Sequence, residues 1–504
     1  MKKLNAHFKD KNIFLITLIF TITHCLIFII PNAQFWDDWY LTGINTKTLL
    51  RLYNEAGSMF NFFAWLHIGM LKLGLPFYRF FTFFLYLAST FLFYKIVKRQ
   101  NFIQENDKFL LVILFAILPL NFSRVTLITF GYTVCFFAFF LGWFLIKKHK
   151  IMSTLLFIIS FNLQSLLVFF LLPFLEVYFS TKEKTKKTLI YLGLLSLLPF
   201  VWFYIKVKIY SPFGEFETYN QIYSIENLTF AINNFITNLD SIKFTITDFR
   251  RYSKLSSLPS LFSLILLILS FLTAYFFSKK MFKTKNEDLT IPYSYIFLTI
   301  LCLILATFPY FILGISPSYY NFNSRHQILM PIGVALLFLS MIKIILKINK
   351  IFSINLNSLT IKIYFVTILI GLSMLANWCN YINSFYDWRK QKLLIDFFSN
   401  SDEIQNSDLI LFSDQTNNMN NRSYKNYELT GMVKKSFKNE DKFFITPGQL
   451  SAYQNGEFDH LFIDYWMSNN HIRKENPSIV RLNIRGTAYN PIFNLEHIDI
   501  SANK

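Results

Sequence analysis

The sequence predicts a polytopic α-helical membrane protein with about eleven transmembrane helices and a small C-terminal α/β domain outside the membrane. Of its 504 residues, 53% are hydrophobic and 19% aromatic, and the mean hydropathy is +0.37. This composition excludes an ordinary soluble domain. Apolar stretches of roughly 20 residues recur up to position 379, as helices that cross a bilayer require. Beyond it, the apolar runs shorten to strand length.

The formal net charge of +19 does not indicate a nucleic-acid partner, because the basic residues stand in short clusters between apolar stretches. Such clusters mark the cytoplasmic ends of transmembrane helices. They lie at 2–11, 95–99, 147–150, 182–187, 279–285 and 343–350. We therefore expect a cell-membrane protein that crosses the bilayer many times, with a cytoplasmic N-terminus.

The apolar segments between these clusters predict the transmembrane helices. The clear ones are 12–30, 77–97, 125–146, 188–206, 259–278, 291–313, 327–346 and 361–379, and the shorter 107–121 is counted with them. Residues 151–179 are too long for one helix and are interrupted by Asn162 and Gln164, so two short spans are expected there. Residues 59–75 carry His67 and Lys72 and fit an amphipathic helix in the membrane interface.

This topology places four segments on the outer face of the membrane. They are the loops 31–76, 207–258 and 316–326, and the tail 380–504. In the tail, runs of strand length occur at 408–412, 442–445, 460–463 and 479–485, and the last alternates with period two. With a helix expected at 393–398, the tail is predicted to form an extracytoplasmic α/β domain.

Asp37 and Asp38 are the main candidate site. They follow directly on the first apolar stretch and stand between Trp36 and Trp39. Neighbouring carboxylates repel, which raises the proton affinity of one of them unless a cation lies between them. The pair therefore suits a general base, or a divalent metal such as Mg²⁺ or Mn²⁺ held by Asp38. The alternative is an exposed pair that caps the following helix.

This layout resembles the GT-C superfamily of membrane glycosyltransferases, in which an acidic pair follows the first transmembrane helix. The stretch from Trp65 to Phe80 strengthens the resemblance: an apolar helix, a turn at Gly74 and Arg79 at the opening of the second span look like the ArnT/PMT-like branch. The resemblance covers residues 10–150 in pattern and the remainder in topology only.

The resemblance implies a GT-C-like catalytic domain over residues 1–379 and an extracytoplasmic domain over 380–504. It implies transfer of a sugar, with inversion, from a polyprenyl-phosphate donor to an envelope glycan or lipid acceptor on the outer face. Asp37 would take the proton of the acceptor, and Asp38 would hold a metal or orient the acceptor.

The other candidate residues are positioned to bind the lipid phosphate or the acceptor. They are Arg325, His326, Arg124, Arg79 and His67. A guanidinium group binds phosphate through two parallel N–H bonds. The alternative for the arginines is an anchor in the headgroup region, and for a lone histidine an ordinary place on an amphipathic helix.

Two other functions remain open. An O-antigen-type polysaccharide polymerase also has about a dozen spans, but relies on outer-loop arginines and gives no reason for an acidic pair after the first span. A transporter or flippase places charges in mid-span and often has two related halves. The spans here are nearly free of charge and no internal repeat is visible, which favours an enzyme at the membrane surface.

Overall fold

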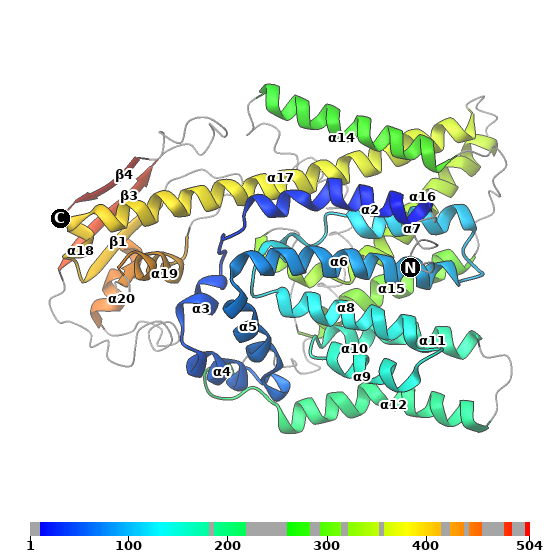
Figure 1. The fold of residues 1–504 in the computed structure, drawn as a ribbon, viewed down its shortest axis with the longest axis horizontal. Helices are drawn as coiled ribbons and strands as arrows, with labels where there is room; N and C mark the ends of the chain where they lie inside the picture. The colour runs from blue at the N-terminus through cyan, green and yellow to red at the C-terminus, as the bar shows by residue number, and fades with distance from the viewer. Residues whose placement is uncertain are drawn as a thin grey trace.

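The computed structural model describes residues 11–180, 186–217, 260–282, 293–313, 321–351, 357–414, 424–437, 443–455, 478–485 and 499–503. These residues form a bundle of long helices with a small sheet beyond one end (Figure 1). Among these described residues, seven helices are long and apolar enough to cross a membrane: Lys11–Ile29, Leu75–Lys98, Leu189–Ile209, Leu264–Met281, Tyr293–Tyr310, Met330–Asn349 and Ser358–Asn400. The structure thus agrees with the predicted helical membrane protein.

The elements of the first half follow in the order α2 (Lys11–His24), η1 (Cys25–Ile29), α3 (Asp38–Gly43), α4 (Thr46–Glu55), η2 (Met59–Asn61), α5 (Phe62–Leu73), α6 (Leu75–Lys98), α7 (Glu105–Ile117), η3 (Phe122–Val125), α8 (Phe130–Leu145), α9 (Lys150–Ser160), α10 (Ser165–Phe169), α11 (Leu171–Ser180), α12 (Lys186–Ile209) and η4 (Gly214–Phe216). The second half contains α14 (Ser260–Met281), α15 (Tyr293–Ile312), η7 (Asn321–Gln327), α16 (Met330–Ile351), α17 (Ser358–Asn400), α18 (Asp402–Gln405), β1 (Leu409–Asp414), α19 (Asn426–Phe437), β2 (Phe443–Ile445), η8 (Pro447–Gln449), α20 (Leu450–Asn455), β3 (Ile479–Arg485) and β4 (Asp499–Asn503).

The predicted spans fall into two groups. The seven at 12–30, 77–97, 188–206, 259–278, 291–313, 327–346 and 361–379 each coincide with one of the long apolar helices. The stretches 107–121 and 125–146 are the shorter α7 and α8, and 151–179 contains α9, α10 and α11 with a break at 161–164. The total of eleven crossings stays a prediction.

Helix α5 lies within the segment expected at the membrane interface. It has 12 residues, so it is about 18 Å long, well short of the hydrocarbon core of about 30 Å. With α3 and α4 it lies at the end of the bundle where α6 begins (Figure 1). Its short length and its position at one end of the bundle fit a helix that does not cross the membrane.

Helix α17 joins the bundle to the sheet. It runs for 43 residues, so the predicted domain boundary at 379 falls inside a continuous helix, as does the helix expected at 393–398. Leu394 and Phe398 near its end pack with residues of β1, β3 and α19 in one buried cluster. The described residues from Asp402 to Asn503, here called the C-terminal unit, therefore fold onto the end of α17.

The C-terminal unit contains a four-stranded sheet in the order β2-β1-β3-β4. Strand β1 pairs in parallel with β2 and β3, whereas β4 is antiparallel to β3. The strands predicted at 408–412, 442–445 and 479–485 correspond to β1, β2 and β3. The strand expected at 460–463 lies outside the described residues, as does most of the predicted outer loop 207–258.

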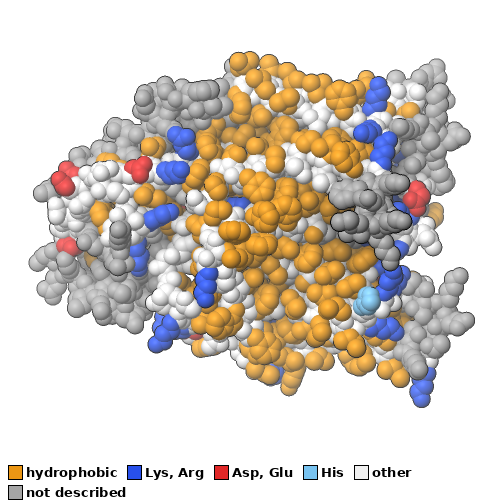
Figure 2. Space-filling model, in the orientation of Figure 1, with side chains coloured by type: hydrophobic (Ala, Val, Ile, Leu, Met, Phe, Trp, Pro, Cys, Tyr) orange, Lys and Arg blue, Asp and Glu red, His pale blue; other side chains and the backbone are white. Residues whose placement is uncertain are grey.

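Basic side chains from several helices meet at one end of the bundle, here called the basic end. The Glu176 carboxylate lies 2.7 Å from Arg99 Nε and 2.8 Å from Lys147 Nζ, and Lys343 Nζ lies 2.9 Å from Asp107. Hydrophobic side chains cover the middle of the visible face, with Lys and Arg gathered on both sides of this band (Figure 2). The band has the form expected of a surface that faces lipid.

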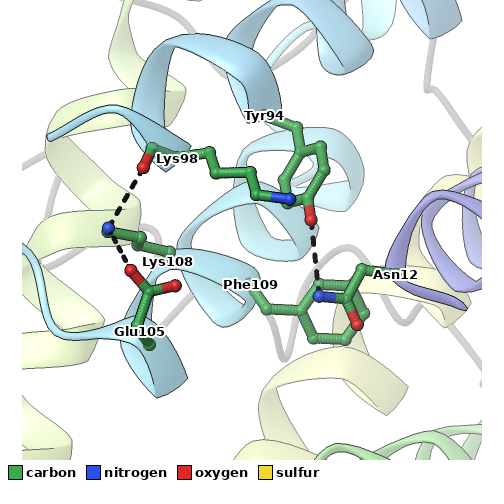
Figure 3. A pocket seen from close by; sticks show the side chains of 6 residues that line it. All are labelled: Asn12, Tyr94, Lys98, Glu105, Lys108 and Phe109. Atoms are coloured by element: carbon green, nitrogen blue, oxygen red, sulfur yellow. Dashed lines mark hydrogen bonds and ion pairs between the residues drawn. The ribbon is translucent and has the colours of Figure 1, made fainter. Parts of the chain in front are cut away.

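A cavity of about 120 Å³ lies at the basic end (Figure 3). Its lining side chains already bind one another: Lys108 Nζ lies 2.5 Å from Glu105, and Asn12 Nδ2 lies 3.4 Å from the Tyr94 hydroxyl. The cavity is too small for a lipid-linked sugar, for which pockets of a few hundred Å³ are usual. The cavity at the basic end is therefore not a candidate binding site for such a donor.

Candidate active site

Four segments meet at the end of the bundle opposite the basic end, here called the acidic-pair end. They are the start of α3, the turn around η3, η7 and the start of α19. The Ser123 backbone N donates to Ser324 Oγ at 2.9 Å, which joins η3 to η7. The Leu127 backbone N donates to Asp38, which joins the η3 turn to α3. Every candidate site residue lies in or beside these segments or on α5 and α6.

Asp38 is fully buried and acts as an acceptor for three backbone N–H groups. Its Oδ2 accepts from Phe35 N at 2.9 Å, and its Oδ1 accepts from Leu127 N at 2.7 Å and Ile128 N at 2.9 Å. Burial raises the pKa of Asp38 to about 7, against the opposing effects of Arg79 and of these backbone donors. Through its hydrogen bonds to Phe35, Leu127 and Ile128, Asp38 links the segment before α3 to the loop before α8, which are far apart in the sequence.

Both carboxylate oxygens of Asp38 already accept backbone N–H groups, one at Oδ2 and two at Oδ1, which leaves about one of their four lone-pair sites for a cation. Within the described ranges, no group of three or more His, Cys, Asp or Glu side chains could hold a metal ion. Asp38 thus anchors the segments that donate to it, and a divalent metal held by Asp38 stays a prediction.

Asp37 is half-buried, and its Oδ1 accepts a hydrogen bond from the Tyr427 hydroxyl at 3.0 Å. It occupies the N-cap position of α3, but its side chain makes no capping hydrogen bond. With Asp38 buried as well, the alternative of an exposed helix-capping pair is wrong. Asp37 thus combines partial exposure with a fixed orientation, which suits a group that exchanges protons with a ligand.

Trp36 connects the acidic pair to η7. Its φ of 51° is in the left-handed region, and its backbone N donates to Glu428 Oε1 at 3.1 Å. Its ring stacks on Phe322 with centroids 5.9 Å apart, and the Arg325 guanidinium carbon lies 3.8 Å from the centroid of the same Phe322 ring. The structure therefore brings Arg325 and the acidic pair together through two aromatic rings.

Arg79 lies beneath the segment that leads to the acidic pair. The side chain is 1% exposed, and its Nη2 donates to Ala33 O at 2.9 Å. Its Nη1 is buried without a hydrogen-bond partner in the described parts of the chain. The positive charge of Arg79 lowers the pKa of Asp38, opposing the effect of burial, so the guanidinium and this carboxylate lie near each other.

Arg124 occupies a buried position in η3. Its Nε donates to Asn121 O at 2.7 Å, its Nη1 lies 3.3 Å from the His24 ring nitrogens, and its Cζ lies 5.2 Å from the centre of the Tyr86 ring. Arg124 lies in η3 and Arg325 lies in η7, and the hydrogen bond from Ser123 to Ser324 joins these two segments.

The two candidate histidines have different surroundings. His67 is fully buried between the rings of Tyr53 and Tyr78, and its Nδ1 lies 3.2 Å from the Tyr78 hydroxyl. These contacts are those of a packed core histidine. His326 is half-buried beside the Tyr310 ring, and burial with the nearby Arg325 lowers its pKa to about 3, so it is neutral at physiological pH.

Sequence reasoning missed three side chains that contact the acidic-pair segment: Phe322, Tyr427 and Glu428. Phe322 lies in an aromatic stretch that offers no reason to select it. Tyr427 and Glu428 follow the acidic pair by some 390 residues, and no local pattern at the start of a helix distinguishes them from ordinary surface residues.

Comparisons of the chain with protein-family models, with curated proteins and with solved structures found no match. Functional inference therefore comes from the geometry of the acidic-pair end. A half-buried carboxylate there can accept a proton, and guanidinium groups there can bind an anionic phosphate.

Proposed function

We propose that this chain is a membrane glycosyltransferase of the GT-C type. It moves a sugar from a polyprenyl-phosphate donor to a glycan or lipid acceptor of the cell envelope, on the outer face of the membrane. The observation that carries the proposal is the half-buried Asp37, held at the same end of the bundle as Arg79, Arg124 and Arg325.

The reaction needs one proton acceptor and a site for one leaving anion. An acceptor hydroxyl or amine gives its proton to Asp37 while its oxygen or nitrogen attacks the anomeric carbon. The bond from that carbon to the phosphate oxygen breaks, and the lipid phosphate leaves with the electron pair. Attack from the face opposite the phosphate inverts the anomeric centre in a single displacement.

Three guanidinium groups lie at the acidic-pair end, where Arg79 and Arg124 are buried and Arg325 is half-exposed. Among the described residues none of them forms an ion pair with a carboxylate; their hydrogen bonds go to carbonyl or amide oxygens and to His24. The charge of Arg79 is partly offset by the nearby Asp38, whereas a buried cation such as Arg124 is costly in a protein that spans a membrane, and an anionic ligand offsets that cost. Arg325 is half-exposed, so it suits direct contact with phosphate.

The sidedness of the proposal follows from the positive-inside rule. Arg99, Lys147 and Lys343 come from three of the predicted cytoplasmic clusters, and all lie at the basic end. We infer that this end is cytoplasmic, together with the N-terminus, and that the acidic pair and the C-terminal unit are extracytoplasmic. About eleven crossings are consistent with that arrangement when the short helices α7 to α11 are included.

The test is the substitution Asp37→Asn in cells that carry no other copy of the gene. Loss of the proton acceptor should lower transfer by about 100-fold or more, so mass spectrometry of the envelope glycans should show a glycan that lacks one sugar. Asp396→Asn is the matched control, because Asp396 is an exposed carboxylate on α17. An unchanged glycan profile with the Asp37→Asn protein inserted at normal abundance would overturn the proposal.

A further inference from the structure

Helix α19 of the C-terminal unit brings two neighbouring side chains to the acidic-pair segment. The Tyr427 hydroxyl donates to Asp37 Oδ1 at 3.0 Å. Glu428 Oε1 accepts from the backbone N of Trp36 at 3.1 Å. One side chain thus contacts the carboxylate and the other the backbone beside it, so α19 fixes both the position and the direction of Asp37.

Glu428 binds a strained turn. It is fully buried, and its second carboxylate oxygen accepts from Lys425 N at 3.1 Å, at the start of its own helix. Trp36, which it contacts, has a φ of 51°. A non-glycine residue in that region costs about 1–3 kcal/mol and persists only where surrounding contacts hold it. Glu428 supplies such a contact.

Tyr427 is held so that its hydroxyl remains a donor. Its ring packs on Tyr40, with centroids 4.8 Å apart. Burial, followed by the charges of Asp37 and Glu428, raises the pKa of Tyr427 well above its ordinary value. The hydroxyl therefore keeps its proton at physiological pH, and the hydrogen bond to Asp37 has a fixed direction.

The C-terminal unit is also fastened to the bundle around this contact. The Tyr424 hydroxyl donates to the carboxylate of Asp387 on α17, and Gln391 Nε2 donates to Gln34 O at 2.7 Å. Trp39 is part of the buried cluster of the unit. The segment on both sides of the acidic pair is thus packed against residues that follow the membrane helices.

We propose that Tyr427 and Glu428 are positioning residues for sugar transfer, through which the C-terminal unit completes the active site. This inference rests on the proposed function of Asp37. Tyr427 orients the carboxylate that takes the acceptor proton. Glu428 holds the Trp36 turn. Because the Trp36 ring stacks on Phe322 and the Arg325 guanidinium lies over the same Phe322 ring, Glu428 also keeps this turn in a fixed position relative to Arg325.

The first experiment measures the contact without reference to activity. Hydrogen–deuterium exchange is followed in the full-length protein in detergent, for peptides that include Trp36. Glu428→Ala removes the acceptor of the Trp36 amide, so exchange there should rise at least about tenfold. Glu428→Gln keeps a carbonyl oxygen in reach and should restore most of the protection. Equal exchange at Trp36 in the wild type and Glu428→Ala would overturn the inference.

The second experiment measures sugar transfer in cells by mass spectrometry of the envelope glycans. Tyr427→Phe keeps the aromatic ring and removes the hydroxyl, so transfer should fall about tenfold, the value of one hydrogen bond to a charged group. Glu428→Ala should reduce transfer similarly and Glu428→Gln should rescue it. Tyr453→Phe is the matched control: it removes the hydroxyl of another buried tyrosine of the same unit, which packs with Leu409, Leu411 and Ile445, and should leave transfer near wild type.

The two measurements separate failure of the inference from failure of the proposed function. Full transfer by Tyr427→Phe and Glu428→Ala, with transfer abolished by Asp37→Asn, would overturn the positioning role alone. Unchanged glycans in Asp37→Asn would overturn the proposed function and with it the positioning role, whereas the exchange data would still decide whether the contact exists. Equal losses in Tyr427→Phe and Tyr453→Phe would indicate a general weakening of the unit and also contradict the inference.

Discussion

Asp38 shows how one buried carboxylate can join two loops that are far apart in the sequence. It satisfies the backbone N–H groups of Phe35, Leu127 and Ile128, which would otherwise be buried without partners. The loop that leads into α3 and the loop before α8 are therefore held against each other. The adjacent Asp37 is left half-exposed.

Asp38→Ala should destabilise the folded protein, because it leaves three backbone donors without an acceptor. Each unsatisfied buried donor costs about 1–3 kcal/mol, so the total loss should be at least about 3 kcal/mol. Asp38→Asn should cost less, since its amide still offers one oxygen. Thermal unfolding of the purified protein in detergent measures both. A melting temperature for Asp38→Ala equal to that of the wild type would contradict the anchoring role.

The stability that Asp38 contributes should also depend on pH. Its pKa is raised from 3.8 to about 7, so between these values the folded protein binds more protons than the unfolded chain. By linkage, stability falls as the pH rises from about 4 to about 7 and is then constant with respect to this group. Melting temperatures measured across this range should fall more steeply for the wild type than for Asp38→Asn. Parallel curves for the two proteins would contradict a raised pKa of Asp38 in the folded state.

The residue scale also shows what sequence can and cannot predict. The acidic pair was recognisable because carboxylates beside a transmembrane helix are costly. Its local geometry was not, because the partners of Asp38 lie 89 and 90 residues away and that of Asp37 lies 390 residues away. A single amino-acid sequence contains no pattern that predicts long-range hydrogen bonds of this kind.

Among the elements, the transmembrane helices were the most predictable. The bilayer fixes their length, and the described helices keep the order in which the apolar stretches occur. The boundary of the membrane domain was harder to place. Helix α17 continues through position 379, since a helix can leave the membrane without any change in its own hydrogen bonds.

At the basic end, α6, α8 and α11 are tied together by Glu176. Its carboxylate contacts Arg99 and Lys147 and accepts from Trp143 Nε1 at 2.6 Å. Glu176→Gln should therefore lower the free energy of unfolding by about 2 kcal/mol, because two partly buried cations lose their counter-ion. Thermal unfolding in detergent checks this.

Glu105→Gln is the control for that substitution. Glu105 also pairs with a lysine, Lys108, but its side chain is 80% exposed, and an exposed pair contributes less than about 1 kcal/mol. Equal losses for Glu176→Gln and Glu105→Gln would show that the Glu176 contacts do not join the helices.

The whole molecule has an apolar band with Lys and Arg side chains on both sides of it (Figure 2), and three of the predicted cytoplasmic clusters contribute Arg99, Lys147 and Lys343 to the basic end. The positive-inside rule then predicts opposite accessibility for the two ends. Cysteine introduced as Ser399→Cys, at an exposed position near the end of α17, should react with a membrane-impermeant maleimide in intact cells. Lys148→Cys, exposed at the basic end, should react only after the cells are permeabilised. Labelling in the reverse order would place the acidic pair in the cytoplasm and contradict the account.

The measurement that tests the central claim most directly is the amount of sugar-carrying polyprenyl phosphate in lipid extracts of cells that express Asp37→Asn as their only copy. If Asp37 takes the acceptor proton, the donor is made but not consumed. It should accumulate several-fold over cells with the wild-type chain or with Asp396→Asn, as quantified by mass spectrometry. Identical lipid extracts from the three strains, with each protein inserted at the same level, would contradict a role for this carboxylate in sugar transfer from a lipid phosphate.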